Sequence, residues 1–109
     1  MADTIASFKV DYFRFLDPEG RLVDGVQVPA LARDVKQLVS LYKLMTLTRV
    51  FDKKAVALQR TGKLGTYASC LGHEAAHVAI GSAMREEDCF APMYREYAAQ
   101  FYRGVKMSD

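Results

Sequence analysis

A helical hydrophobic period between Asp34 and Gly62 limits what this chain can fold into more than any other feature. Apolar side chains recur there at steps of three and four residues, with Lys and Arg between them. The apolar positions are Val35, Leu38, Leu41, Tyr42, Met45, Val50, Phe51, Ala55 and Leu58. Asp34 with Gln37 three positions on is typical of a helix start, and Gly62 is typical of a helix end. The pattern predicts one helix of about 28 residues, roughly 42 Å long.

Little chain is left to cover such a helix. The sequence has 109 residues, half of them hydrophobic, which suits one small domain. After a glycine-containing loop, Gly62 to Gly72, two shorter helices are expected, from about His73 to Met84 and from about Tyr94 to Arg103. They would cover only part of the apolar stripe of the long helix. We therefore expect the chain to dock on more protein, of its own chain or of a partner.

The first 33 residues follow another pattern. Residues 8–16 roughly alternate between apolar and polar side chains, and Asp17-Pro18-Glu19-Gly20 has the composition of a turn. We expect a short hairpin or extended arm over residues 1–33, followed by a helical unit over residues 34–109. The predicted fold class is therefore mainly α: one long helix, two shorter helices and an N-terminal arm.

Charge and hydropathy exclude some classes of protein. The formal net charge is only +2, and the 15 Lys and Arg residues are scattered among 13 acids, so nucleic acid is not an expected partner. No apolar run is long enough to cross a membrane. The N-terminus lacks the features of a signal or transit peptide, which predicts a cytoplasmic protein. Cys70 and Cys89 are expected to be reduced and buried. The terminal Ser108-Asp109 is typical of a helix start, so we expect either that the chain continues or that it ends in a frayed natural terminus.

The most conspicuous short motif is His73-Glu74-Ala75-Ala76-His77, which matches HExxH. Two histidines four positions apart on a helix can bind one zinc ion, while the glutamate polarises a bound water. The motif, however, lies in the first turn of its expected helix, and no third histidine follows. A small zinc hydrolase is therefore kept as an alternative, and Glu74 is first interpreted as an acid favoured by the helix dipole.

Two other segments carry reactive side chains. Tyr94 and Arg95 stand where an extended segment is expected to become a helix, and an arginine near a helix start can bind phosphate. Ser69 and Cys70 lie in a loop without a phosphate-binding glycine spacing or a suitably placed acid, so both are interpreted as structural.

Three segments in this order resemble the N-terminal portion of the alpha subunit of thiamine-diphosphate-dependent 2-oxo acid dehydrogenases. They are Leu41–Asp52 (LYKLMTLTRVFD), Gly65–Ala76 (GTYASCLGHEAA) and Pro92–Gly104 (PMYREYAAQFYRG). The resemblance extends over roughly residues 8–109. In this family the glycine of the second segment precedes a variable residue and then Glu-Ala, which makes the HExxH match a coincidence.

The resemblance also implies roles for individual residues. Tyr94 and Arg95 match the family's Tyr-Arg pair that holds the diphosphate of the cofactor, and Met93 stands at a cofactor-side position. Thr66 and Tyr67 match positions near the mouth of the active site. The resemblance places no catalytic residue and no metal ligand in this segment. The magnesium ligands that accompany thiamine diphosphate are expected after Asp109.

The implied parent enzyme has an α/β thiamine-diphosphate-binding fold and decarboxylates a 2-oxo acid oxidatively, with pyruvate the expected substrate. Its acyl group passes to a lipoyl group on an acyltransferase component. The implied assembly is a heterotetramer, in which a beta subunit and a second alpha subunit are partners. The segment by itself is expected to be inactive. A non-enzymatic helical interaction module, docking through the long helix, is the remaining alternative.

Overall fold

The computed structural model describes residues 2–108, and the chain divides into two units, Met1–Arg33 and Asp34–Asp109. Over the described residues the fold is mainly helical and contains no sheet, as the sequence predicts. The elements are a short 3-10 helix η1 (Ala30–Arg33) and three α-helices: α1 (Val35–Arg60), α2 (Glu74–Ala83) and α3 (Tyr97–Tyr102). Asp109, half of the expected Ser-Asp helix start, lies outside the described residues.

The long helix α1 begins and ends at the residues that the sequence indicates. A carboxylate oxygen of Asp34 accepts the backbone N–H of Gln37 at 3.0 Å, which satisfies one donor of the first turn. At the other end Gly62 has a φ of +71°. Its N–H donates to Gln59 and the N–H of Lys63 donates to Leu58, at 3.0 and 2.9 Å. These two bonds form a Schellman motif, which stops the helix after 26 residues.

The third helix is shorter than the sequence predicts. We expected it from about Tyr94, but α3 begins at Tyr97, and Glu96 is its N-cap residue. The carboxylate of Glu96 accepts the backbone N–H groups of Met93 and Arg95, at 3.0 and 3.2 Å. These bonds hold residues 93–95 in a local turn outside the helix. The expectation that Tyr94 and Arg95 lie at a helix start is therefore wrong.

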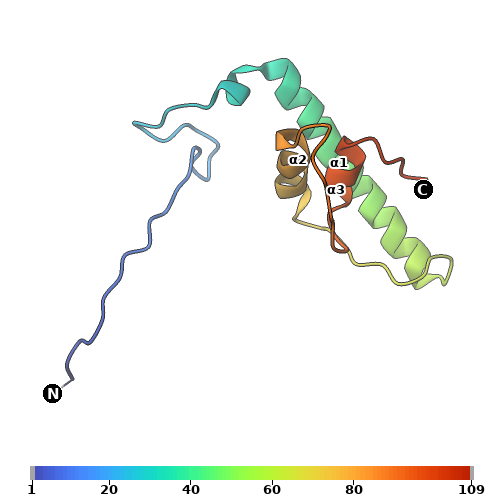
Figure 1. Ribbon diagram of the computed structural model, residues 1–109, viewed down its shortest axis with the longest axis horizontal. Coiled ribbons are helices and arrows are strands. Elements are labelled where there is room, and N and C mark those ends of the chain that lie inside the picture. The colour runs from blue at the N-terminus through green and yellow to red at the C-terminus, as the bar shows by residue number, and fades with distance from the viewer. Residues whose placement is uncertain (1, 109) are drawn as a thin grey trace. The chain divides into compact units, whose positions relative to one another are not determined.

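The helical unit packs α2 and α3 against each other and against the middle of α1, which extends past both of them (Figure 1). A small residue allows the close contact between α2 and α3. A Cβ atom added to Gly81 would lie 2.9 Å from the Cβ of Tyr102 and 3.2 Å from the Cα of Ala99. The buried apolar residues are few, as expected for so short a unit: Ala55, Cys70, Val78, Ala98 and Ala99.

Much of the apolar surface stays uncovered. On α1, large hydrophobic side chains including Val35, Tyr42 and Val50 are exposed, in agreement with the expected shortage of covering helices. In the N-terminal unit, an isolated antiparallel bridge between Leu16 and Leu22 closes the Asp17–Gly20 turn. Most of the apolar side chains before that turn are exposed. Among the described residues, no helix is long and apolar enough to span a membrane.

Candidate functional site

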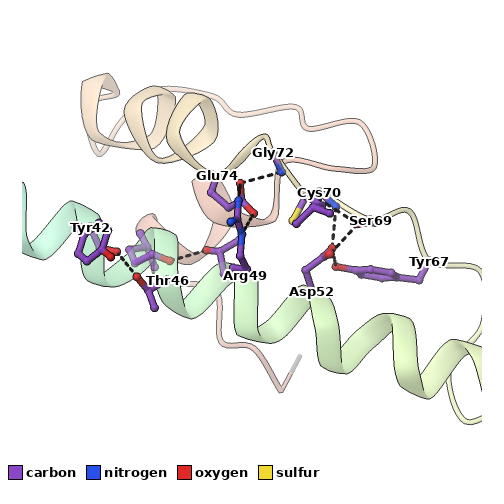
Figure 2. Close-up of polar contacts among 12 residues, drawn as sticks. Tyr42, Thr46, Arg49, Asp52, Tyr67, Ser69, Cys70, Gly72 and Glu74 are labelled. Atoms are coloured by element: carbon purple, nitrogen blue, oxygen red, sulfur yellow. Dashed lines mark hydrogen bonds and ion pairs between the residues drawn. The ribbon is translucent and has the colours of Figure 1, made fainter. Parts of the chain in front are cut away.

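A buried carboxylate on α1 organises the loop that connects α1 to α2. The carboxylate of Asp52, a residue only 3% exposed, accepts the hydroxyl of Tyr67 at 2.8 Å and that of Ser69 at 2.7 Å. It also accepts the backbone N–H of Cys70 at 2.8 Å. Figure 2 shows the Asp52 side chain pointing from α1 into this loop. Burial raises the pKa of Asp52, but the bonds from Ser69, Cys70 and Tyr67 outweigh it, so the pKa is lowered and the carboxyl is ionised.

A second carboxylate joins α1 to the start of α2. The carboxylate of Glu74 accepts two hydrogen bonds from the guanidinium of Arg49, at 2.9 and 3.0 Å, and one from the backbone N–H of Gly72 at 3.0 Å (Figure 2). The Arg49 hydrogen bond is the main reason why the pKa of Glu74 is lowered. Glu74 is only 4% exposed and serves as a structural anchor between α1 and α2.

This pairing contradicts the zinc interpretation of the HExxH match. The carboxylate that would polarise a water is held by Arg49, and His73 precedes α2 instead of lying within it. The rings of His73 and His77 are 5.2 Å apart at 77°. The described residues contain no group of three His, Cys, Asp or Glu side chains that could hold a metal ion. Within the same residues, the buried Nδ1 of His77 has no hydrogen-bond partner.

The structure brings Arg95 to the same loop that Asp52 organises. The guanidinium of Arg95 donates a hydrogen bond to the backbone carbonyl of Ser69 and lies 5.2 Å from the centre of the Tyr94 ring. Arg95 is half-buried, whereas Met93 and Tyr94 are exposed. The backbone donors of Met93 and Arg95 bind Glu96, so the helix-start argument for a phosphate site at these residues does not hold.

The two loop residues in the predicted site differ in their surroundings. The ring of Tyr67 stacks on that of Tyr97, with centres 5.2 Å apart and an angle of 18° between the planes. Burial and the hydrogen bond to Asp52 raise the pKa of Tyr67. Thr66, one residue earlier, is exposed. Ser69 thus shares the Asp52 carboxylate with Tyr67 and accepts directly from Arg95, while Thr66, Met93 and Tyr94 are exposed.

The two cysteines do not behave alike. Cys70 is fully buried, and its burial raises the pKa of the thiol to about 12, so it stays protonated and is a poor nucleophile. Cys89 is exposed, which contradicts the expectation that both thiols are buried. Cys89 lies in the segment between α2 and α3, outside any helix, and its side chain is exposed. Both thiols are free.

The sequence reasoning missed Arg49 and Asp52 as organising residues. A signal for Asp52 was present, since it falls on the side of the helical pattern that carries Thr48 and Ala55, both buried. An acid on the apolar face of a helix must find hydrogen-bond donors, because a buried charge without partners is costly. The donors come from residues 67–70, and their proximity is a tertiary feature.

Comparison with known proteins places these contacts in a family context. The family described as the dehydrogenase E1 component matches residues 42–109. The pyruvate dehydrogenase E1 component subunit alpha of Mycoplasma pneumoniae is 39% identical over 94 residues, 86% of this chain and 26% of that protein.

Two further relatives carry the same description. The protein of Staphylococcus epidermidis is 35% identical over 101 residues, 93% of this chain and 27% of its own length. The Acholeplasma laidlawii protein is 38% identical over 93 residues, 85% of this chain and 26% of its own. The chain therefore spans about a quarter of the length of these relatives. No solved structure matches it.

Proposed function

Since the chain belongs to the dehydrogenase E1 component family, we propose that it acts as the N-terminal part of a pyruvate dehydrogenase alpha subunit. The observation that carries this proposal is the 35–39% identity to pyruvate dehydrogenase alpha subunits over most of the chain. The proposed reaction is oxidative decarboxylation of pyruvate with transfer of the acyl group to a lipoyl group. Thiamine diphosphate would supply the decarboxylation chemistry when bound, while the protein would bind and orient it.

Arg95 is the residue of this chain best suited to hold the cofactor diphosphate. A guanidinium carries five N–H donors in a planar fork. Among the described residues one of them is used for the Ser69 carbonyl. The remaining donors can bind an anion, and the cationic group fits the charge of a diphosphate. We propose Tyr94 as its neighbour in this role, with Met93, Thr66 and Tyr67 lining the approach to the cofactor.

We propose that the rest of the site comes from outside this chain. As the family resemblance implies, we propose that the magnesium ligands follow Asp109 in the full subunit. We propose a heterotetramer with a beta subunit and a second alpha subunit, and delivery of the acyl group to a lipoyl-bearing acyltransferase. The exposed apolar side chains of α1 fit such docking.

The first test compares the 109-residue chain with the subunit that its gene encodes, co-expressed with the beta subunit. We expect thiamine diphosphate- and Mg²⁺-dependent reduction of an artificial electron acceptor by pyruvate in the assembled enzyme only. Turnover by the 109-residue chain alone would contradict the proposal. A preference for a branched 2-oxo acid over pyruvate would change the proposed substrate and leave the family unchanged. A reading frame that encodes only this chain would favour the interaction-module alternative.

A further inference from the structure

We infer that Asp52 is a positioning residue for Arg95, acting through the loop segment Tyr67–Cys70. The inference rests on the proposed role of Arg95 toward the cofactor diphosphate. Asp52 binds the loop from inside the helical unit, and Ser69 of that loop binds Arg95. Asp52 touches neither the cofactor nor the substrate in this proposal. Its effect is to hold the guanidinium in place before the anion arrives.

The first step is the set of hydrogen bonds by which Asp52 holds the loop. Three donors from four consecutive residues converge on one buried carboxylate: two hydroxyls and one backbone N–H. Hydrogen bonds to an ionised acceptor are stronger than those between neutral groups. Because the carboxylate has only 3% exposure, water cannot replace a lost donor easily. This segment is therefore held more firmly than an ordinary surface loop.

The second step is that Ser69 bonds both Asp52 and Arg95. Its hydroxyl donates to Asp52 at 2.7 Å, while its backbone carbonyl accepts from the Arg95 guanidinium. One bond uses the side chain of Ser69 and the other its backbone. A shift of Ser69 toward or away from α1 therefore moves the acceptor to which Arg95 is bound. Anchoring one nitrogen of the planar guanidinium restricts the direction in which its other donors point.

The third step is an aromatic contact that ties the loop to the segment after Arg95. Tyr67 donates its hydroxyl to Asp52 and stacks its ring on Tyr97, two residues beyond Arg95. Phe51, next to Asp52 on α1, packs edge-on against Phe101, with ring centres 4.9 Å apart. Contacts with α1, made directly or through the loop, thus hold both the side chain of Arg95 and the backbone that follows it. Such preorganisation lowers the ordering cost of anion binding.

The experiment measures the dissociation constant of thiamine diphosphate by calorimetry on the assembled, cofactor-free enzyme, together with kcat at saturating cofactor. The variants are Asp52→Asn, Arg95→Ala and the double variant. Asp52→Asn replaces one carboxylate oxygen by an amide NH₂ group, which cannot accept a hydrogen bond from the donors of the loop. We expect its dissociation constant to rise about tenfold, with kcat within about twofold of wild type. Hydrogen exchange of the Cys70 amide should accelerate in this variant.

The double variant separates the two proposals. In the Arg95→Ala background, Asp52→Asn should change the dissociation constant by less than about twofold, since the group it positions is gone. If Arg95→Ala alone leaves cofactor affinity unchanged, the proposed role of Arg95 is wrong. If Arg95→Ala weakens binding and Asp52→Asn does not, the positioning role is overturned. It is also overturned if Asp52→Asn has the same effect with and without Arg95.

A milder variant and a control guard against loss of folding. Tyr67→Phe removes one hydrogen bond to Asp52 and keeps the ring stack. We expect about a threefold weaker affinity, again only when Arg95 is present, and unchanged affinity in Tyr67→Phe would contradict the inference. The control is Asp17→Asn, a hydrogen-bonded acid of the N-terminal turn whose partners are the backbone N–H and the Nε of Arg21. It should leave cofactor affinity at the wild-type value.

Discussion

The guanidinium of Arg49 and the carboxylate of Glu74, 25 residues apart in the sequence, form a two-bond ion pair at 2.9 and 3.0 Å. The Glu74 side chain is 5% exposed and the Arg49 side chain 51%, so the pair runs from solvent into the helical unit. Because Glu74 also accepts the N–H of Gly72, the pair sets where α2 begins relative to α1. Part of the HExxH match is thus a structural anchor.

Replacement of Glu74 by Gln should destabilise the helical unit. Gln cannot accept both Arg49 bonds and the Gly72 N–H with the strength of a carboxylate. We expect the free energy of unfolding to fall by about 1–2 kcal/mol, measured by urea denaturation followed by circular dichroism. Glu87→Gln, at an exposed acid between α2 and α3, is the matched control and should stay within about 0.5 kcal/mol of wild type. Equal effects of both variants would argue against the anchor.

Acid should weaken the same contacts. The pKa values of Glu74 and Asp52 are lowered on folding from their ordinary values of 4.5 and 3.8. Carboxyls with lowered pKa contribute stability above the ordinary values, and this contribution is lost as the pH falls through the lowered ones. Urea midpoints should therefore be flat from pH 7 to about 5 and decline below about 4. In Glu74→Gln the decline should be shallower, and an identical slope would contradict the assignment.

Gly81 should not tolerate a side chain. An added Cβ would lie 2.9 Å from the Cβ of Tyr102 and 3.2 Å from two backbone atoms of Ala99, so α2 and α3 would have to separate. We expect Gly81→Ala to lower the free energy of unfolding by about 1–3 kcal/mol despite the better helix propensity of alanine. Gly65→Ala is the control, because nothing lies within 4 Å of its added Cβ. Its stability should match wild type.

The two thiols should differ in reactivity. Cys89 is exposed, whereas Cys70 is fully buried with a thiol pKa of about 12. We expect a thiol reagent such as iodoacetamide to label Cys89 in the native chain at pH 8, and to label both residues in denaturant. Mass spectrometry after proteolysis identifies the labelled site. Rapid native labelling in Cys89→Ser would show that Cys70 is accessible, against the structure.

Local patterns explain why some elements were predictable. The bounds of α1 follow from Asp34 and Gly62, because a capping side chain and a positive φ act within a few residues of the helix end. The start of α3 was predicted three residues too early. The carboxylate of Glu96 accepts the backbone N–H groups of Met93 and Arg95, which precede it. The sequence alone does not distinguish this arrangement from one in which Glu96 binds residues that follow it.

By itself, the amino-acid sequence determined the helical fold class, the extent of α1 and the family to which the chain belongs. Each depends on residue order or on spacing within one element. Only the tertiary structure decided that Glu74 pairs with Arg49 and that Asp52 gathers Tyr67, Ser69 and Cys70. It also joined Arg95 to the Ser69 carbonyl. These contacts join residues 15 to 26 positions apart, and burial selects the partners, because a carboxylate removed from water must find its donors within the fold.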